Sequence, residues 1–68
     1  MQTIDVFDGH NTCQSRELRD LSPARVCAEA RRISKVAGVY KTVANIGAEW
    51  AEYERGVCKS ATSAEYLD

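Results

Sequence analysis

Apolar residues recur at helical spacing in the middle of the chain, at Val26, Ala30, Ile33 and Ala37. These positions project within one narrow arc of a helix, while the far side of the same helix is basic. The basic positions are Arg25, Arg31, Arg32 and Lys35. The pattern predicts an amphipathic helix with one apolar face and one charged face.

Both ends of this helix carry their own signals. Ser22 is a favoured N-cap residue, and Pro23 follows at the first helical position, where a missing N–H group does no harm. Leu21 and Val26 are spaced to form a hydrophobic staple around that cap. Gly38 stands where a left-handed residue commonly ends a helix. We therefore expect the helix to run from Pro23 to the residues just before Gly38.

Residues 39–46 and 49–55 alternate around Gly47 and Ala48, which predicts a β-hairpin. On the helix side, the register pairs Ala44 with Ala51, Thr42 with Tyr53 and Tyr40 with Arg55. On the other side it pairs Asn45 with Trp50, Val43 with Glu52 and Lys41 with Glu54. The last pair joins opposite charges across the strands, which supports the register.

A first hairpin is expected nearer the N-terminus. Residues 3–7 are rich in β-formers, and a turn cluster at 8–11 leads into a second arm at 12–18. The order strand, strand, helix, strand, strand predicts an α+β fold, in which one helix packs on one face of a small antiparallel sheet. We expect a single domain at 1–59 and a flexible acidic tail at 60–68.

Length and charge limit the classes of function. A chain of 68 residues is one domain at most, and its formal net charge of -1 lacks the strong positive charge of a dedicated nucleic-acid binder. No apolar run is long enough to span a membrane, and residues 1–10 do not resemble a signal peptide. These features favour a cytoplasmic protein with a protein partner and no membrane contact.

The three cysteines do not form a recognisable framework. Cys13, Cys27 and Cys58 are an odd number, widely separated and without a CxxC pair, which argues against a disulfide scaffold or a zinc site. Cys27 flanks the apolar arc of the helix, where we expect it to be a small buried residue. A bridge between Cys13 and Cys27 is the alternative.

Candidate chemistry is sparse. His10 is the single histidine, and its pairing with Cys13 lacks the orienting group that nucleophilic catalysis needs. The carboxylate pairs, Glu52 with Glu54 and Asp5 with Asp8, are typical of solvated surface. We expect a protein that is not an enzyme and that uses no cofactor, no metal and no small-molecule substrate.

Two charged surfaces are candidates for partner binding. The first is the uncovered sheet face, where an exposed tryptophan among carboxylates suits a protein interface. Its predicted residues are Glu49, Trp50, Glu52, Glu54 and Lys41. The second is the basic helix face formed by Arg25, Arg31, Arg32 and Lys35. A register shift of one residue would instead place Trp50 in the core.

Three segments carry a resemblance to a known family. They are Leu21-Ser22 with Ala24-Arg25, Arg32-Ile33-Ser34-Lys35, and the stretch from Gly47 to Gly56 that contains Trp50 and Tyr53. Together they cover about the middle half of the chain, and they resemble small phage-encoded anti-CRISPR proteins that inhibit type I surveillance complexes.

The resemblance implies stoichiometric inhibition of a bacterial type I CRISPR surveillance complex in the cytoplasm of an infected host. The inhibitor would block target DNA binding or recognition of the flanking motif, and no cofactor would be needed. The sheet carboxylates would then occupy a basic channel made for phosphates. The alternatives are a small nucleic-acid-binding or regulatory module that uses the basic helix face, and a structural protein that forms a homodimer through the open sheet face.

Overall fold

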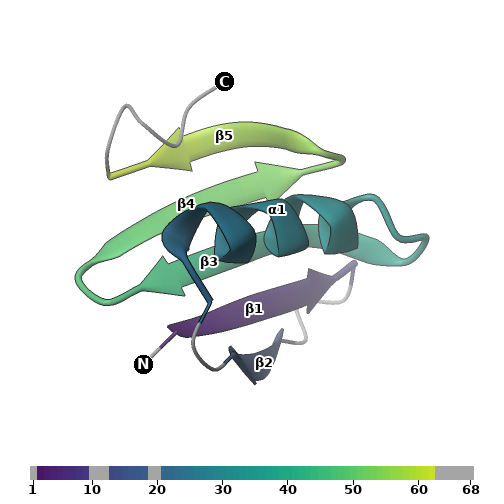
Figure 1. Ribbon diagram of the computed structural model, residues 1–68. Coiled ribbons are helices and arrows are strands. Elements are labelled where there is room, and N and C mark those ends of the chain that lie inside the picture. The colour runs from purple at the N-terminus through teal and green to yellow at the C-terminus, as the bar shows by residue number, and fades with distance from the viewer. Residues whose placement is uncertain (1, 10–12, 19–20, 63–68) are drawn as a thin grey trace.

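The computed structural model describes residues 2–9, 13–18 and 21–62. In chain order the elements are β1 (Gln2–Asp8), β2 (Cys13–Leu18), α1 (Pro23–Ser34), β3 (Val39–Ile46), β4 (Glu49–Glu54) and β5 (Val57–Ala61). Figure 1 shows one sheet with α1 lying across one of its faces. The predicted α+β class, with a small antiparallel sheet and one helix, is confirmed.

The strands form one sheet in the order β2-β1-β3-β4-β5, and every neighbouring pair is antiparallel. Both predicted hairpins are present. In the second hairpin the register is the expected one from Thr42 opposite Tyr53 to Asn45 opposite Trp50. The predicted pairs of Tyr40 with Arg55 and Lys41 with Glu54 lie beyond the ladder, because β4 ends at Glu54 and turns into β5. β1 and β3, which are not consecutive in the chain, pair at the centre and join the two hairpins into one sheet.

The prediction of four strands is wrong, because β5 adds a fifth strand at the edge beside β4. Ser60 lies opposite Glu52 and Ala61 opposite Ala51, so this strand extends two residues into the segment expected to be a tail. A register shift between Glu52 and Tyr53 interrupts the ladder. The remainder of the predicted tail, from residue 63 onward, lies outside the described residues.

Helix α1 begins as predicted and ends earlier than predicted. The Ser22 hydroxyl oxygen accepts the N–H of Arg25 at 3.3 Å, and Pro23 is the first helical residue. The helix stops at Ser34, and the N–H of the C-cap residue Lys35 turns back to carbonyls of the last turn. Ala37 is therefore exposed in the connection to β3, and its placement on the apolar helix face is wrong.

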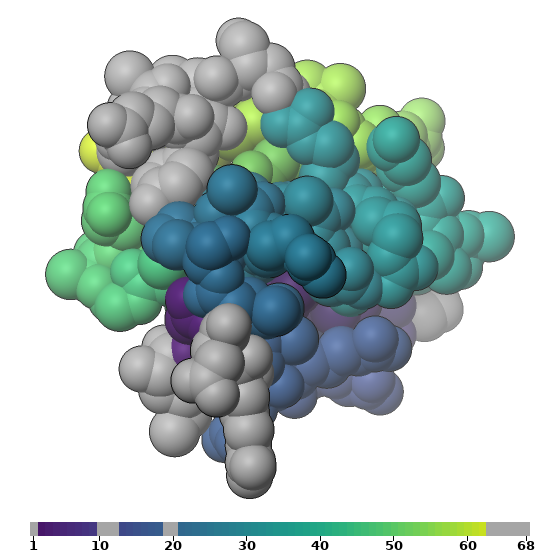
Figure 2. Space-filling view, in the orientation of Figure 1, coloured from purple at the N-terminus to yellow at the C-terminus, as the bar shows by residue number. Residues whose placement is uncertain are grey.

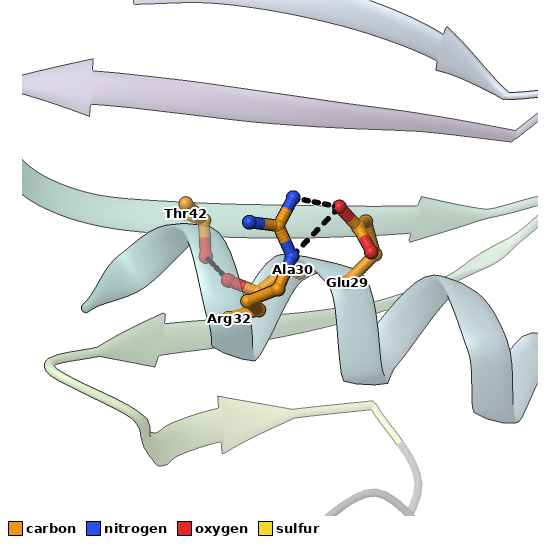
Figure 3. A network of polar contacts seen from close by, with 4 residues as sticks. All are labelled: Glu29, Ala30, Arg32 and Thr42. Carbon is orange, nitrogen blue, oxygen red and sulfur yellow. Dashed lines mark hydrogen bonds and ion pairs between the residues drawn. The ribbon is translucent and has the colours of Figure 1, made fainter. Parts of the chain in front are cut away.

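The core lies between α1 and the sheet. Its buried apolar residues are Ile4, Val26, Cys27, Ala30, Ile33, Ala44, Ala51 and Tyr53. Helix α1 packs chiefly over β3 and also contacts β1 and β4. The buried Thr42 hydroxyl donates to the carbonyl of Ala30 at 2.7 Å, which ties the helix to the central strand (Figure 3).

The small side chains of Ala44 and Ala51 leave room for α1 to approach the middle of the sheet. Figure 2 shows the helix, in blue to teal, spread over the centre of this side of the molecule. In the described parts of the chain, no helix is long and apolar enough to cross a membrane.

Candidate functional site

The sheet face opposite α1 is the first candidate surface, and we call it the open face. Strand alternation places on it every second residue of the three central strands. These are Thr3, Asp5 and Phe7 of β1, Lys41, Val43 and Asn45 of β3, and Trp50, Glu52 and Glu54 of β4. Within residues 2–9, 13–18 and 21–62, no second layer covers this face (Figure 1).

A network of hydrogen bonds crosses one half of the open face. The Asp5 carboxylate accepts the Ser15 hydroxyl at 2.6 Å and the Asn45 amide at 2.9 Å. The Asn45 amide also donates to the Thr3 hydroxyl oxygen at 3.1 Å. Asp5 therefore connects β2, β1 and β3 as a hydrogen-bond acceptor.

Lys41 makes the side-chain contacts in the other half of the open face. Its Nζ lies 3.6 Å from Glu52 Oε1 and 4.9 Å from the centre of the Phe7 ring. The sequence predicts that Lys41 pairs with Glu54, directly across the strands, whereas the structure pairs it diagonally with Glu52. Both side chains are partly buried, so this pair is less screened than a fully exposed one.

Trp50 lies on the open face, near the start of β4, with 37% of its surface exposed. Its backbone is held by Thr62. The Thr62 hydroxyl oxygen accepts the Trp50 N–H at 3.0 Å, and the Thr62 N–H donates to the Trp50 carbonyl at 3.0 Å. The alternative that places Trp50 in the core is therefore wrong, because the hairpin keeps its predicted register.

Four of the five residues predicted for this surface share the open face, namely Lys41, Trp50, Glu52 and Glu54. Glu49 does not. It lies two residues before Ala51, so alternation puts it on the helix side of the sheet, opposite Ile46. Placing Glu49 on the open face is therefore wrong, because strand alternation alone puts it on the same side as Ala51.

The basic helix face does not form one continuous patch. Arg31 lies over the Tyr53 ring, with its Cζ 5.2 Å from the ring centre, on the β4 side of α1. The aliphatic stem of Lys35 packs against Gly56 in the turn between β4 and β5. Arg32 instead donates through Nε to Glu29 at 3.0 Å (Figure 3). Three of the four predicted cations are thus held in different local contacts.

Three arginine charges act on the Glu29 carboxyl, and we call this group the Glu29 cluster. The hydrogen bond from Arg32 lowers the pKa of the Glu29 carboxyl, and the charges of Arg32, Arg16 and Arg25 lower that pKa further. Arg16 belongs to β2, so this cluster spans the helix and an edge strand. Sequence reasoning missed Arg16, since only the fold brings its charge close enough to act on Glu29.

The interior shows one unusual titratable group. Burial raises the pKa of the Tyr53 phenol, and its side-chain hydrogen bond with Cys27 raises that pKa further. Cys27 is buried as predicted, with 8% of its surface exposed. All three cysteines lie in described segments and remain thiols, so the alternative bridge from Cys13 to Cys27 is not formed.

Other chemical candidates find little support in the geometry. In the described part of the chain, no group of three or more histidine, cysteine, aspartate or glutamate side chains is placed to hold a metal ion. His10 lies outside the described residues, and Cys13 is exposed on β2.

Comparison of the chain with protein-family models, with curated proteins and with solved structures gives no match. The anti-CRISPR resemblance therefore stays a prediction from the sequence. The open face and the basic helix face are the two surfaces that bear on function.

Proposed function

We propose that this protein inhibits a bacterial type I CRISPR surveillance complex stoichiometrically, in the host cytoplasm, by docking through its open face. The observation that carries the proposal is Trp50, 37% exposed near the start of β4, on the same open face as Glu52 and Glu54. Tryptophan is over-represented among the residues that dominate binding energy, and carboxylates complement a surface built for nucleic acid.

The fixed geometry of the open face supports a role in binding. Asn45 donates a hydrogen bond to Asp5, and Lys41 forms an ion pair with Glu52. These contacts exist in the protein alone, before any partner binds. A surface that is already ordered loses less conformational entropy on association than a flexible one. The face can therefore bind tightly without a folding transition.

The carboxylates carry the charge that suits a phosphate-binding channel. Glu52 and Glu54 are two residues apart on one strand, so both lie on the open face. A DNA strand likewise presents a row of negative charges, one at each phosphate. This correspondence supports blocking of target DNA binding or of flanking-motif recognition.

The test uses a purified type I surveillance complex, with binding measured alongside competition by target DNA. We expect Trp50→Ala and Glu54→Gln each to weaken binding at least about tenfold, as hot-spot substitutions do. Arg25→Gln is the matched control, because Arg25 is exposed on the helix side. Circular dichroism checks the fold of each variant.

Two outcomes would contradict different parts of the proposal. If the wild-type chain does not bind any type I complex, the proposed partner is wrong. If it binds and the two open-face variants bind equally well, the proposed face is wrong.

A second candidate is a small nucleic-acid-binding or regulatory module. The observation that favours it is the hydrogen bond from Arg32 to Glu29, together with the charges of Arg16 and Arg25, which also lower the pKa of Glu29. Binding by this cluster would weaken steeply as salt is added, because phosphate contacts release counterions. This candidate is favoured if the wild-type protein binds duplex DNA or RNA but not the surveillance complex. The double variant Arg25→Gln with Arg32→Gln should then lose the nucleic-acid binding.

A further inference from the structure

Apolar side chains gather at the end of the sheet where α1 stops and β4 turns into β5. Among the described residues, four large apolar side chains stand out as exposed, and three of them are here. Val36 is 50% exposed, Tyr40 52% and Val57 51%. Figure 1 shows the connection from α1 to β3 and the turn from β4 to β5 at the same end, on the right of the view.

Irregular strand pairing opens a cleft between these segments. The β3–β4 ladder ends at Thr42 and Tyr53, so the first residues of β3 continue beyond it while β4 turns away into β5. The β1–β3 register also shifts between Phe7 and Asp8 at this end. Irregularities of this kind redirect side chains and are common beside functional sites.

Two adjoining hollows make up the cleft. One, of about 440 Å³, is lined by Val39, Tyr40, Glu54, Arg55, Val57 and Lys59. The other, of about 420 Å³, lies between Arg55 and the segment from Ser34 to Val39. Val39 and Arg55 line both hollows, so the two hollows lie next to each other at this end of the sheet.

The walls of the cleft are fixed to one another. The Gly56 N–H donates to the Ser34 hydroxyl oxygen at 2.9 Å, and that hydroxyl donates to the Arg31 carbonyl at 2.6 Å. The Lys35 stem packs over the same turn. The β4–β5 turn is thereby attached to the end of α1, which keeps the cleft open.

Arg55 is the one described non-glycine residue with a positive φ, at 51°. Asparagine or glycine meets this conformation with less strain than a long side chain does. Arg55 and Gly56 are the two central residues of the β4–β5 turn, and two-residue hairpin turns commonly require a positive φ at both positions. The turn holds Arg55 where it lines both hollows.

The charge of the cleft is opposite in sign to that of the whole chain. Lys35, Arg55 and Lys59 line it together with a single carboxylate, Glu54, whereas the formal net charge of the protein is -1. A partner therefore needs both an apolar side chain to fill the hollow and negative charge beside it.

We propose that this cleft binds an acidic segment of a partner protein, in which an apolar side chain is flanked by carboxylates. The apolar side chain packs against Val39, Tyr40 and Val57, and the carboxylates pair with Arg55 and Lys59. The cleft borders the open face at Glu54 but is otherwise built from different residues. The proposal does not depend on what the open face binds.

The probe is a short fluorescein-labelled synthetic peptide that alternates glutamate with leucine, titrated against the full chain by anisotropy. Amide chemical-shift mapping locates the bound peptide. One control peptide replaces glutamate with lysine, and a second replaces leucine with glycine. We expect binding of the first peptide alone, with shifts confined to residues 35–40 and 54–59.

Arg55→Asn is the decisive variant, because asparagine tolerates the positive φ while removing the shared cation. We expect it to fold normally and to lose affinity about tenfold, as removal of a charge-assisted hydrogen bond implies. Val57→Thr keeps a β-branched side chain and should also weaken binding, while Arg25→Gln should leave binding unchanged.

The proposal is overturned if the Arg55→Asn and Val57→Thr variants bind the peptide like wild type, or if the lysine peptide binds as well as the glutamate peptide. It is also overturned if the shifts fall at Trp50 and Glu52, or if duplex DNA displaces the peptide from the cleft.

Discussion

The two faces of the sheet use alternate residues of the same strands, yet they are held by different interactions. The covered face consists of side chains such as Ile4, Ala44 and Tyr53, which pack against α1. The open face consists of polar groups such as Asp5 and Asn45, which satisfy one another at the surface. Stability therefore depends mainly on the covered face, and residues of the open face can change at little cost to the fold.

The strongest test of this contrast is Ile33→Ala on the covered side. Ile33 is 5% exposed, and its truncation leaves a cavity, so we expect the free energy of unfolding to fall by about 2 to 4 kcal/mol. Urea denaturation measures the change. Val36→Ala, at a position 50% exposed, should change the same quantity by less than about 0.5 kcal/mol. Equal effects in the two variants would refute the assignment of the buried helix face.

Loss of a hydroxyl at the C-terminal end of α1 should lower the free energy of unfolding by an intermediate amount. Ser34→Ala removes the acceptor of the Gly56 N–H and the donor to the Arg31 carbonyl. Leaving such partly buried groups without partners costs about 1 to 3 kcal/mol, measurable as a shift in the denaturation midpoint. Ser60→Ala, at an exposed position of β5, is the control and should be nearly neutral.

The covered face should also make the protein sensitive to alkali. The folded state raises the pKa of Tyr53 above its ordinary value of 10.0, so it favours the neutral phenol. That contribution is fully present below pH 10.0 and is lost as the pH rises further. We expect the melting temperature to fall above this pH, with a smaller fall in Tyr53→Phe. The same decline in both proteins would show that Tyr53 is not responsible.

The smallest effect is expected on the open face. Lys41 and Glu52 lie 3.6 Å apart and are both accessible to water, so their coupling should be about 0.5 kcal/mol. A double-mutant cycle with Lys41→Gln and Glu52→Gln measures it, and added salt should reduce it. A coupling energy as large as the loss of unfolding free energy in Ile33→Ala would contradict the view that the covered face supplies most of the stability.

Local signals explain which parts of the fold were predictable. Ser22 and Pro23 set the start of α1 through contacts within one turn, and Gly47 with Ala48 sets the hairpin register through adjacent strands. The fifth strand was not predicted, because residues 57–61 are short, carry Lys59 and Ser60, and face a shifted register. An edge strand of this kind has no strong alternation of apolar and polar residues.

The candidate surfaces were predictable only in part, for a related reason. Trp50, Glu52 and Glu54 follow from the register of one hairpin. The contact between Asp5 and Asn45 joins residues 40 positions apart, and no local pattern specifies which strands become neighbours. The cleft was also missed, since it depends on where β3 and β4 separate.

The pairing of β1 with β3 also has a consequence for how the chain folds. The ladders β1–β2, β3–β4 and β4–β5 each close between neighbours in the sequence, which requires only short loops. The β1–β3 ladder encloses β2 and α1 and needs a much longer loop. Because long-range pairing is slow, arrival of β1 beside β3 should limit the folding rate. Until then the backbone groups of β3 that later pair with β1 have no partner strand. The half-folded chain is therefore the species most exposed to aggregation and proteolysis.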